Sequence, residues 1–289
     1  MLDIIYRYDP RWGLERLLPV DAADARRMLE QGNREFAQMV EFDKGDESTT
    51  TRIVPIDLEE LGVAPADGTA PLHSPFAVVL GCSDARVPTE LIFHQSCNDM
   101  FVVRVAGHVL GSECLGSIDY AIGTLAESLK VVVVLGHSRC GAITAAVDTF
   151  LAPANYLSYS NSHHLRSILD RLLSTVQGAA KTLVGIWGDS VVERPGYRDA
   201  LIEMSVTLNA AVVAHTLRRE YPQQGDSRIE VVFGVYDLVT RKVGARGLAD
   251  EAEEGDSHLG DPPENLAEFL VFSSRLARHH TIRKLLELD

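Results

Sequence analysis

The stretch KVVVVLGHSRCGA, residues 130–142, decides the fold class of this chain, because in it a strand pattern ends directly in reactive side chains. Val131–Leu135 is apolar, rich in β-branched residues and free of polar alternation, which is typical of a strand that is buried on both faces. His137 and Cys140 follow the end of that run. In open parallel sheets, ligands bind beyond the carboxyl ends of the strands. The stretch therefore predicts a parallel sheet with a site at its carboxyl edge.

The same arrangement recurs elsewhere in the chain. The other apolar runs of this kind are Phe76–Leu80, Met100–Val105 and Ile229–Phe233. Helical patterns occupy the intervals between the runs, namely 116–129, 142–150, 165–176 and 201–220. Strands that alternate with helices predict an α/β protein with a central, mostly parallel sheet flanked by helices.

The N-terminal part predicts a helical arm followed by a long loop. Apolar residues at helical spacing predict a helix from Ala22 to about Val40. Asp21 precedes it as an N-cap, because its carboxylate can accept from the free N–H groups of the first turn. Residues 43–75 are polar and rich in turn-forming residues, and we expect them to form a loop with one short helix near residues 58–61.

The C-terminal part predicts an extension to the sheet domain. Residues 250–264 are acidic and contain two adjacent prolines, which is typical of an exposed linker. Beyond it, the apolar spacing over 266–286 predicts two helices. We therefore expect an α/β domain over residues 1–249 and a linker with a helical extension over residues 250–289.

Composition excludes several classes of function. The 41 acidic residues outnumber the 27 basic ones, and the net charge of −14 argues against nucleic acid or an anionic membrane as the main partner. No apolar run approaches the roughly 20 residues that span a bilayer, and residues 1–7 do not have the pattern of a signal peptide. Four cysteines are too few for a disulfide framework. We expect a soluble, cytoplasmic protein whose cysteines are thiols or metal ligands.

Cys82, His137 and Cys140 form the natural set of metal ligands. His137 and Cys140 lie three residues apart at one strand-to-helix turn, and Cys82 follows another strand. Two thiolates and one imidazole suit zinc, and three protein ligands leave the fourth position open, as in catalytic sites. Taken singly, each residue would be read as a buried thiol or a hydrogen-bonded histidine. Cys97 and Cys114 have no comparable ligand pattern, and we expect them to be ordinary buried thiols.

Asp84 and Arg86 lie two residues apart in the segment that carries the first proposed ligand. A bidentate Arg–carboxylate pair would hold Asp84 as a hydrogen-bond acceptor beside the metal position. The same pair could instead simply stiffen the loop. Spacing alone does not distinguish these two roles.

Several motifs, in the same order along the chain, resemble those of beta-class carbonic anhydrases. The three main ones are CSDARVP at 82–88, RVAG at 104–107 and GHSRCG at 136–141. Weaker similarity is found in LEQGNREF at 29–36, GSIDYA at 116–121 and GVYD at 234–237. This chain also departs from that family. His108 replaces an asparagine that is common near this position, and the connections over about 43–75 and 150–200 are longer than usual.

The resemblance implies an enzyme that hydrates carbon dioxide reversibly to bicarbonate and a proton by means of zinc-bound hydroxide. It implies zinc ligands at Cys82, His137 and Cys140, and a catalytic dyad of Asp84 and Arg86, with Asp84 as a possible fourth ligand in a closed state. It also places Gln95 and the backbone N–H of Gly141 at the substrate. A homodimer or a higher even oligomer is expected, with the N-terminal helix packed on the partner.

Two other functions stay open at this point. A hydrolase acting on carbonyl sulfide or carbon disulfide would use the same zinc motif, since these molecules are also small, linear and electrophilic at carbon. A zinc-stabilised scaffold without activity is the second alternative. A scaffold would have no need of the Asp84–Arg86 pair.

Overall fold

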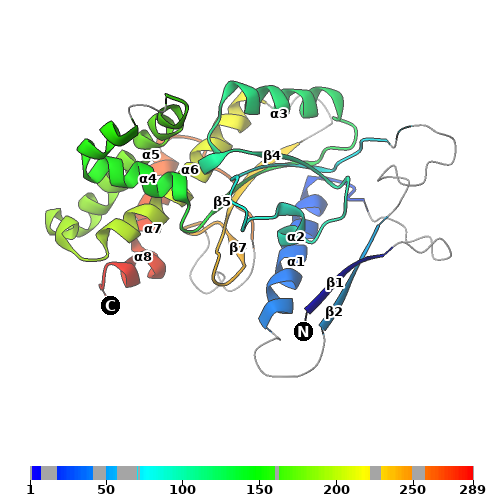
Figure 1. Cartoon of the computed structure of the whole chain (residues 1–289), viewed down its shortest axis with the longest axis horizontal. Helices are drawn as coiled ribbons and strands as arrows, with labels where there is room; N and C mark the ends of the chain where they lie inside the picture. The colour runs from blue at the N-terminus through cyan, green and yellow to red at the C-terminus, as the bar shows by residue number, and fades with distance from the viewer. Residues whose placement is uncertain are drawn as a thin grey trace.

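A computed structural model describes residues 2–7, 18–41, 50–56, 70, 72–159, 163–221, 229–248 and 258–288. Its centre is a five-stranded sheet in the order β4-β3-β5-β6-β7 (Figure 1). The strands are β3 (Ala77–Gly81), β4 (Met100–Arg104), β5 (Val131–His137), β6 (Glu230–Tyr236) and the short β7 (Val243–Gly244). The first four are parallel and β7 is antiparallel to β6. The predicted α/β class with a mostly parallel sheet is confirmed.

Alternate residues of the central strands enter two separate apolar cores, one on each face of the sheet. On β5, Val132 and Val134 face one core, whereas Val131 and Val133 face the other. All seven residues of β5 are buried. This two-sided burial explains why the strand sequences are continuously apolar rather than alternating.

Helices cover both faces of the sheet (Figure 1). One face packs on α1 (Ala22–Glu41) and α2 (Thr89–Phe93). The core on the opposite face includes residues of α3 (Ser112–Thr124), α4 (Gly141–Leu151), α5 (His163–Trp187) and α6 (Tyr197–Glu220), and of the C-terminal helices described below. Short 3-10 turns lie at Ala106–His108, Pro153–Tyr159 and Asp189–Glu193. Much of the long 150–200 connection is therefore helical, since α5 runs well beyond the predicted 165–176.

Several predicted boundaries need correction. The helix expected over 116–129 begins earlier and ends earlier, as Ser112–Thr124. Strand β6 continues to Tyr236, beyond the predicted end at Phe233. At the N-terminal arm, α1 begins and ends almost as predicted, and Asp21 is its N-cap, with its Oδ1 accepting from the N–H of Asp24 at 2.7 Å.

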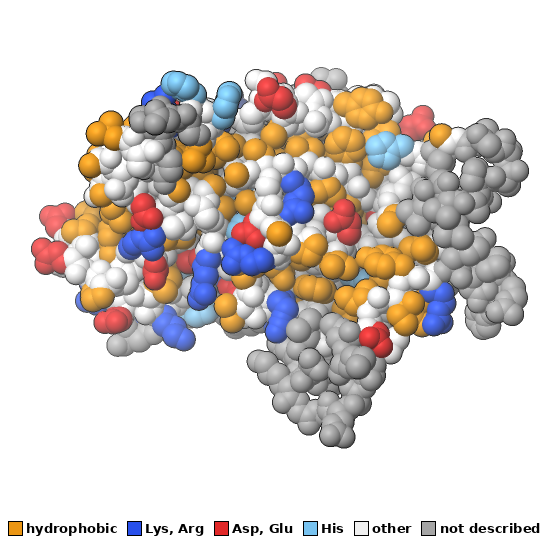
Figure 2. All heavy atoms as spheres, in the orientation of Figure 1, with side chains coloured by type: hydrophobic (Ala, Val, Ile, Leu, Met, Phe, Trp, Pro, Cys, Tyr) orange, Lys and Arg blue, Asp and Glu red, His pale blue; other side chains and the backbone are white. Residues whose placement is uncertain are grey.

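The prediction that residues 43–75 form a loop is wrong for part of this segment, which contains a strand. Residues 50–55 form β2 (Thr50–Pro55), which pairs in parallel with β1 (Leu2–Arg7), and these two strands make a second sheet away from the central one (Figure 1). Hydrophobic side chains remain open to solvent on this part of the surface (Figure 2); Ile5, Tyr6 and Ile53 are each more than a third exposed. The short helix expected near 58–61 lies outside the described residues.

The C-terminal extension packs against the sheet domain rather than standing apart. Leu259 and Gly260 are buried, and the backbone of Gly260 pairs with that of Phe233 on β6. The prediction of an exposed linker is therefore wrong for these residues, while 249–257 lie outside the described part of the chain. The two predicted helices are α7 (Leu266–Arg278) and α8 (His280–Leu285). Trp187 of α5 donates its indole N–H to the carbonyl of Ala277 at 3.1 Å.

Among the described residues, α6 is the one helix long and apolar enough to cross a membrane by length and composition. In this fold 78% of its apolar window is buried inside the molecule. It packs against β5 and β6, so its apolar surface belongs to the core.

Candidate metal centre

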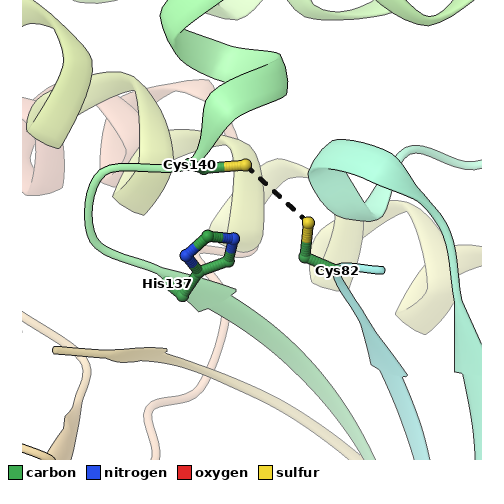
Figure 3. A group of neighbouring side chains, drawn as sticks. All are labelled: Cys82, His137 and Cys140. Carbon is green, nitrogen blue, oxygen red and sulfur yellow. Dashed lines mark hydrogen bonds between the residues drawn. The ribbon is translucent and has the colours of Figure 1, made fainter. Parts of the chain in front are cut away.

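Cys82, His137 and Cys140 meet at the carboxyl edge of the sheet, as the sequence predicts (Figure 3). Cys82 directly follows β3, His137 is the last residue of β5, and Cys140 immediately precedes α4. Their ligand atoms all lie within 4.8 Å of one another, and the two sulfur atoms are 3.9 Å apart. All three side chains are buried. Among the described residues they are the one such group of potential metal ligands.

The parallel pairing of neighbouring strands brings the ligands together. Gly81 of β3 lies opposite Leu135 of β5, so both strands end at the same edge. A tight turn then returns the chain from His137 to Cys140. Within it, Arg139 has φ of 55°, a left-handed conformation that is uncommon for residues other than glycine. The carboxylate of Glu203, on α6, accepts from the N–H of Arg139 at 2.8 Å and holds this turn.

The imidazole of His137 is oriented as a metal ligand. Its Nδ1 lies 3.0 Å from the carbonyl oxygen of Ser138. A carbonyl only accepts, so Nδ1 carries the hydrogen and Nε2 keeps a free lone pair. That Nε2 is fully buried and has no hydrogen-bond partner. A buried lone pair beside two sulfur atoms is the arrangement that a zinc ion would satisfy, so the residues present fit the metal.

The two sulfur atoms, 3.9 Å apart, are within hydrogen-bond distance of each other. This hydrogen bond with Cys140 lowers the pKa of Cys82, and the N–H of Gly107, 3.4 Å from the sulfur, lowers it further. The same hydrogen bond, together with burial, raises the pKa of Cys140. The pocket therefore already favours a thiolate at Cys82, and a thiolate is the form that binds a metal.

Asp84 and Arg86 form the bidentate pair that their spacing allows. Arg86 donates from Nε to Oδ1 at 2.9 Å and from Nη2 to Oδ2 at 2.7 Å, and its backbone N–H also reaches Oδ1 at 2.9 Å. These bonds hold the pKa of Asp84 well below its usual range. Oδ2 of Asp84 lies 3.9 Å from Nε2 of His137. The ionised carboxylate thus stands beside the ligand set, while Arg86 fixes its direction.

Arg104 is a positioning residue that the motif contains but that sequence reasoning did not assign a role. At the end of β4, it donates from Nε to the carbonyl of Cys82 at 2.8 Å and from Nη2 to the carbonyl of Asp84. One guanidinium therefore clamps the backbone on both sides of the segment that carries Cys82 and Asp84. An arginine at the end of the neighbouring strand is the signal that could have revealed it.

A second support, from residues far apart in the sequence, lies under the turn that carries His137 and Cys140. Arg246 joins Glu203 to Asp237, with contacts of 3.3 and 2.6 Å. Burial opposes ionisation of Asp237, but the backbone N–H groups of Thr240 and Val239 hold its pKa below the ordinary value. Glu203 and Arg246 were not identified from sequence, because no local pattern links a helix residue to a turn beyond β6.

The predicted substrate residues lie apart from these contacts. Gln95 is buried beside α1 and donates its amide to the carbonyl of Phe93 at 2.7 Å. Gly141 begins α4, and a Cβ added to it would meet no atom within 4 Å. Their substrate roles stay predictions. Cys97 and Cys114 take part in no disulfide and are only half-buried, so the expectation that they are buried thiols is wrong.

Comparison with known proteins agrees with this geometry. The family model described as carbonic anhydrase matches residues 77–243, more than half of the chain. Carbonic anhydrase 2 of Mycobacterium tuberculosis is 52% identical over 80 residues, which are 28% of this chain and 38% of that protein. The carbonic anhydrase of Mycolicibacterium smegmatis is 42% identical over 105 residues, which are 35% and 46% of the two chains. The matched regions thus span less than half of these relatives.

Solved structures of tetrameric beta-carbonic anhydrases from Sordaria macrospora are also similar, with a TM-score of 0.47 and 20% identity over 60% of this chain and 80% of theirs. The family model covers all three proposed metal ligands, the Asp84–Arg86 pair and the central parallel strands. On that match, the chain belongs to the beta-class carbonic anhydrase family.

Proposed function

We propose that this protein catalyses the reversible hydration of carbon dioxide to bicarbonate, with zinc held by Cys82, His137 and Cys140. The observation that carries the proposal is the convergence of these three ligand atoms beside an ionised, arginine-paired carboxylate. Membership of the carbonic anhydrase family supports it. When bound, zinc would lower the pKa of a coordinated water and supply a nucleophile near neutral pH.

The chain's own residues divide the remaining tasks. Cys82 and Cys140 would hold the metal as thiolates, and His137 would bind through Nε2 because Nδ1 is tied to Ser138. Asp84 would accept a hydrogen bond from the coordinated water and so orient that water toward the substrate. Because Arg86 depresses its pKa, Asp84 is a poor proton acceptor near neutral pH, so its role is orientation rather than general base catalysis.

A closed state with Asp84 as the fourth ligand remains part of the proposal. Oδ2 of Asp84 lies 3.9 Å from Nε2 of His137, and in this conformation Arg86 holds both carboxylate oxygens. Closure would require Asp84 to give up that pair. The two states would differ in whether substrate can reach the fourth position.

Stopped-flow carbon dioxide hydration at about pH 7 and pH 8.5, on protein of known zinc content, tests this function. Fast turnover at both pH values supports an open site, and activity only at pH 8.5 supports a closed site at the lower pH. Parallel assays with carbonyl sulfide and carbon disulfide address the alternative substrates. A folded protein with one zinc per chain that turns over none of the three would overturn the proposal in favour of a scaffold.

For assembly and location we propose a homodimer, or a higher even oligomer, in the cytoplasm. Strand β4 is the edge of the central sheet, and Tyr120 beside it is half exposed and stacks near Phe101 with ring centroids 6.2 Å apart. The unpaired backbone groups of an edge strand are a template for pairing with another chain, which supports a protein contact there. Light scattering at several protein concentrations would measure the subunit number, and a monomer at all of them would contradict it.

A further inference from the structure

The turn Ala106–His108 touches the metal centre through its backbone. The N–H of Gly107 points at Sγ of Cys82, at 3.4 Å. Gly107 and His108 have φ of 66° and 43°, so two consecutive residues are in the left-handed region. For histidine that conformation is uncommon and costs free energy. The turn that delivers this N–H therefore needs support from outside itself.

Asn209 on α6 supplies that support. Its Nδ2 lies 3.1 Å from the carbonyl oxygen of Gly107 and 2.9 Å from Nε2 of His108. The carbonyl only accepts, so the amide NH₂ must face the turn, and its second hydrogen goes to the imidazole. Asn209 and His108 are both buried, at 4% and 0% exposure. Two bonds from one side chain thus hold both left-handed residues.

The imidazole of His108 can only play this part as a neutral acceptor. Burial lowers its pKa to about 4, so it is uncharged near neutral pH. Its ring lies against β5 just before the ligand His137, since a Cβ on Gly136 would come within 3.4 Å of Cε1. The imidazole that bonds to Asn209 is thus packed directly on the strand that ends in His137.

We infer that Asn209 is a positioning residue of the metal centre, which fixes the turn at Gly107 and His108 and so aims the Gly107 N–H at the Cys82 sulfur. The inference rests on the proposed zinc site. A hydrogen bond to a thiolate withdraws negative charge from the sulfur and restricts its direction. Groups that orient a ligand in this way are typically worth about 10- to 100-fold in metal affinity or activity.

Ser205 provides a matched control on the same helix. It lies one turn before Asn209 and is 1% exposed, and its hydroxyl oxygen is buried without a hydrogen-bond partner. Ser205→Ala removes a buried polar group at a similar depth and breaks no hydrogen bond of the structure. Any general effect of altering the α6 core should therefore appear in both variants.

The test compares Asn209→Leu and Ser205→Ala with the wild-type protein in two measurements that do not use turnover. Zinc affinity is measured by competition with a chromophoric chelator, and the thiolate-to-cobalt charge-transfer absorption is measured after loading with Co²⁺. We expect Asn209→Leu to weaken zinc binding by about tenfold and to shift the cobalt band. Ser205→Ala should leave both unchanged. A smaller variant, Asn209→Ser, should move both quantities in the same direction and covers the case in which leucine prevents folding.

Two failures are distinguishable. Folded Asn209 variants with the wild-type zinc affinity and cobalt band would overturn the positioning role and leave the metal centre intact. Wild-type protein that binds neither metal at the two thiolates would overturn the zinc site, and this inference with it.

Discussion

Two of the parallel strand pairs in this structure, β3–β5 and β1–β2, have opposite surroundings. Every residue of β3 and β5 is buried, and their ends carry Cys82 and His137. In the pair of β1 and β2, by contrast, Ile5, Tyr6 and Ile53 remain substantially exposed. Isolated two-stranded sheets are marginally stable in water, whereas strands packed on both faces are held by their side chains. The candidate metal centre is therefore built on the buried pair and not on the peripheral one.

The largest effect should come from removing a proposed ligand in the turn that follows the buried pair. Cys140→Ser replaces a thiolate by a much weaker zinc ligand, and we expect loss of most zinc and nearly all turnover. Elemental mass spectrometry would measure the zinc content, and stopped-flow kinetics would measure turnover. Cys114→Ser, at a half-buried cysteine outside the ligand set, is the control and should keep both. Stoichiometric zinc with normal turnover in Cys140→Ser would refute the ligand assignment.

Shortening one side chain in each strand pair would directly test whether the buried pair contributes more stability than the exposed pair. Leu135 of β5 is fully buried, and Leu135→Ala should cost about 2–5 kcal/mol of unfolding free energy through lost burial and a cavity. Ile5 of β1 is 37% exposed, and Ile5→Ala should change stability by only about 0.5 kcal/mol. Urea unfolding followed by circular dichroism would compare the two variants. Equal losses would show that the peripheral sheet is as integral to the fold as the central one.

Asp84→Asn would separate metal binding from orientation at the carboxyl edge. The amide keeps the shape of the side chain but loses its charge and one accepting oxygen. We expect zinc to be retained and turnover to fall by roughly 10- to 100-fold. Zinc content and the dependence of rate on carbon dioxide concentration would measure this. Unaltered kinetics would remove Asp84 from the catalytic residues and leave it the role of stiffening the loop.

The smallest effect concerns pH. The depressed pKa of Asp84 means that its pairing with Arg86 contributes stability above the unfolded value of about 3.9 and loses it as pH falls further. The stability difference between wild type and Asp84→Asn should therefore be larger at pH 7 than at pH 3. Thermal unfolding of both proteins at the two pH values would measure it. A difference that stays constant would mean that Arg86 does not depress the pKa of Asp84.

The ligand set could be predicted from sequence because its signals are local. Cys82, His137 and Cys140 each sit where an apolar run ends, and parallel strands end at one edge. The Asp84–Arg86 pair is likewise encoded by a spacing of two residues. The β1–β2 sheet was missed because its strands are partly exposed and separated by a whole helix, so neither has the continuous apolar run of a buried strand.

The residues that support the metal centre could not be predicted from sequence for a different reason. Glu203 and Asn209 act on turns that lie 64 and about 100 residues away in the chain. Glu203 accepts from the backbone N–H of Arg139, and Asn209 donates to the backbone carbonyl of Gly107 as well as to the His108 side chain. A backbone N–H or carbonyl leaves no mark on the sequence.

The sequence by itself determined the α/β class, the proposed zinc ligands and the acidic partner of Arg86, because apolar periodicity and reactive side chains are properties of the residues themselves. Only the tertiary structure decided that α6 lies beneath the centre and orients it. That depends on which buried polar groups find one another once the two cores have closed around the sheet.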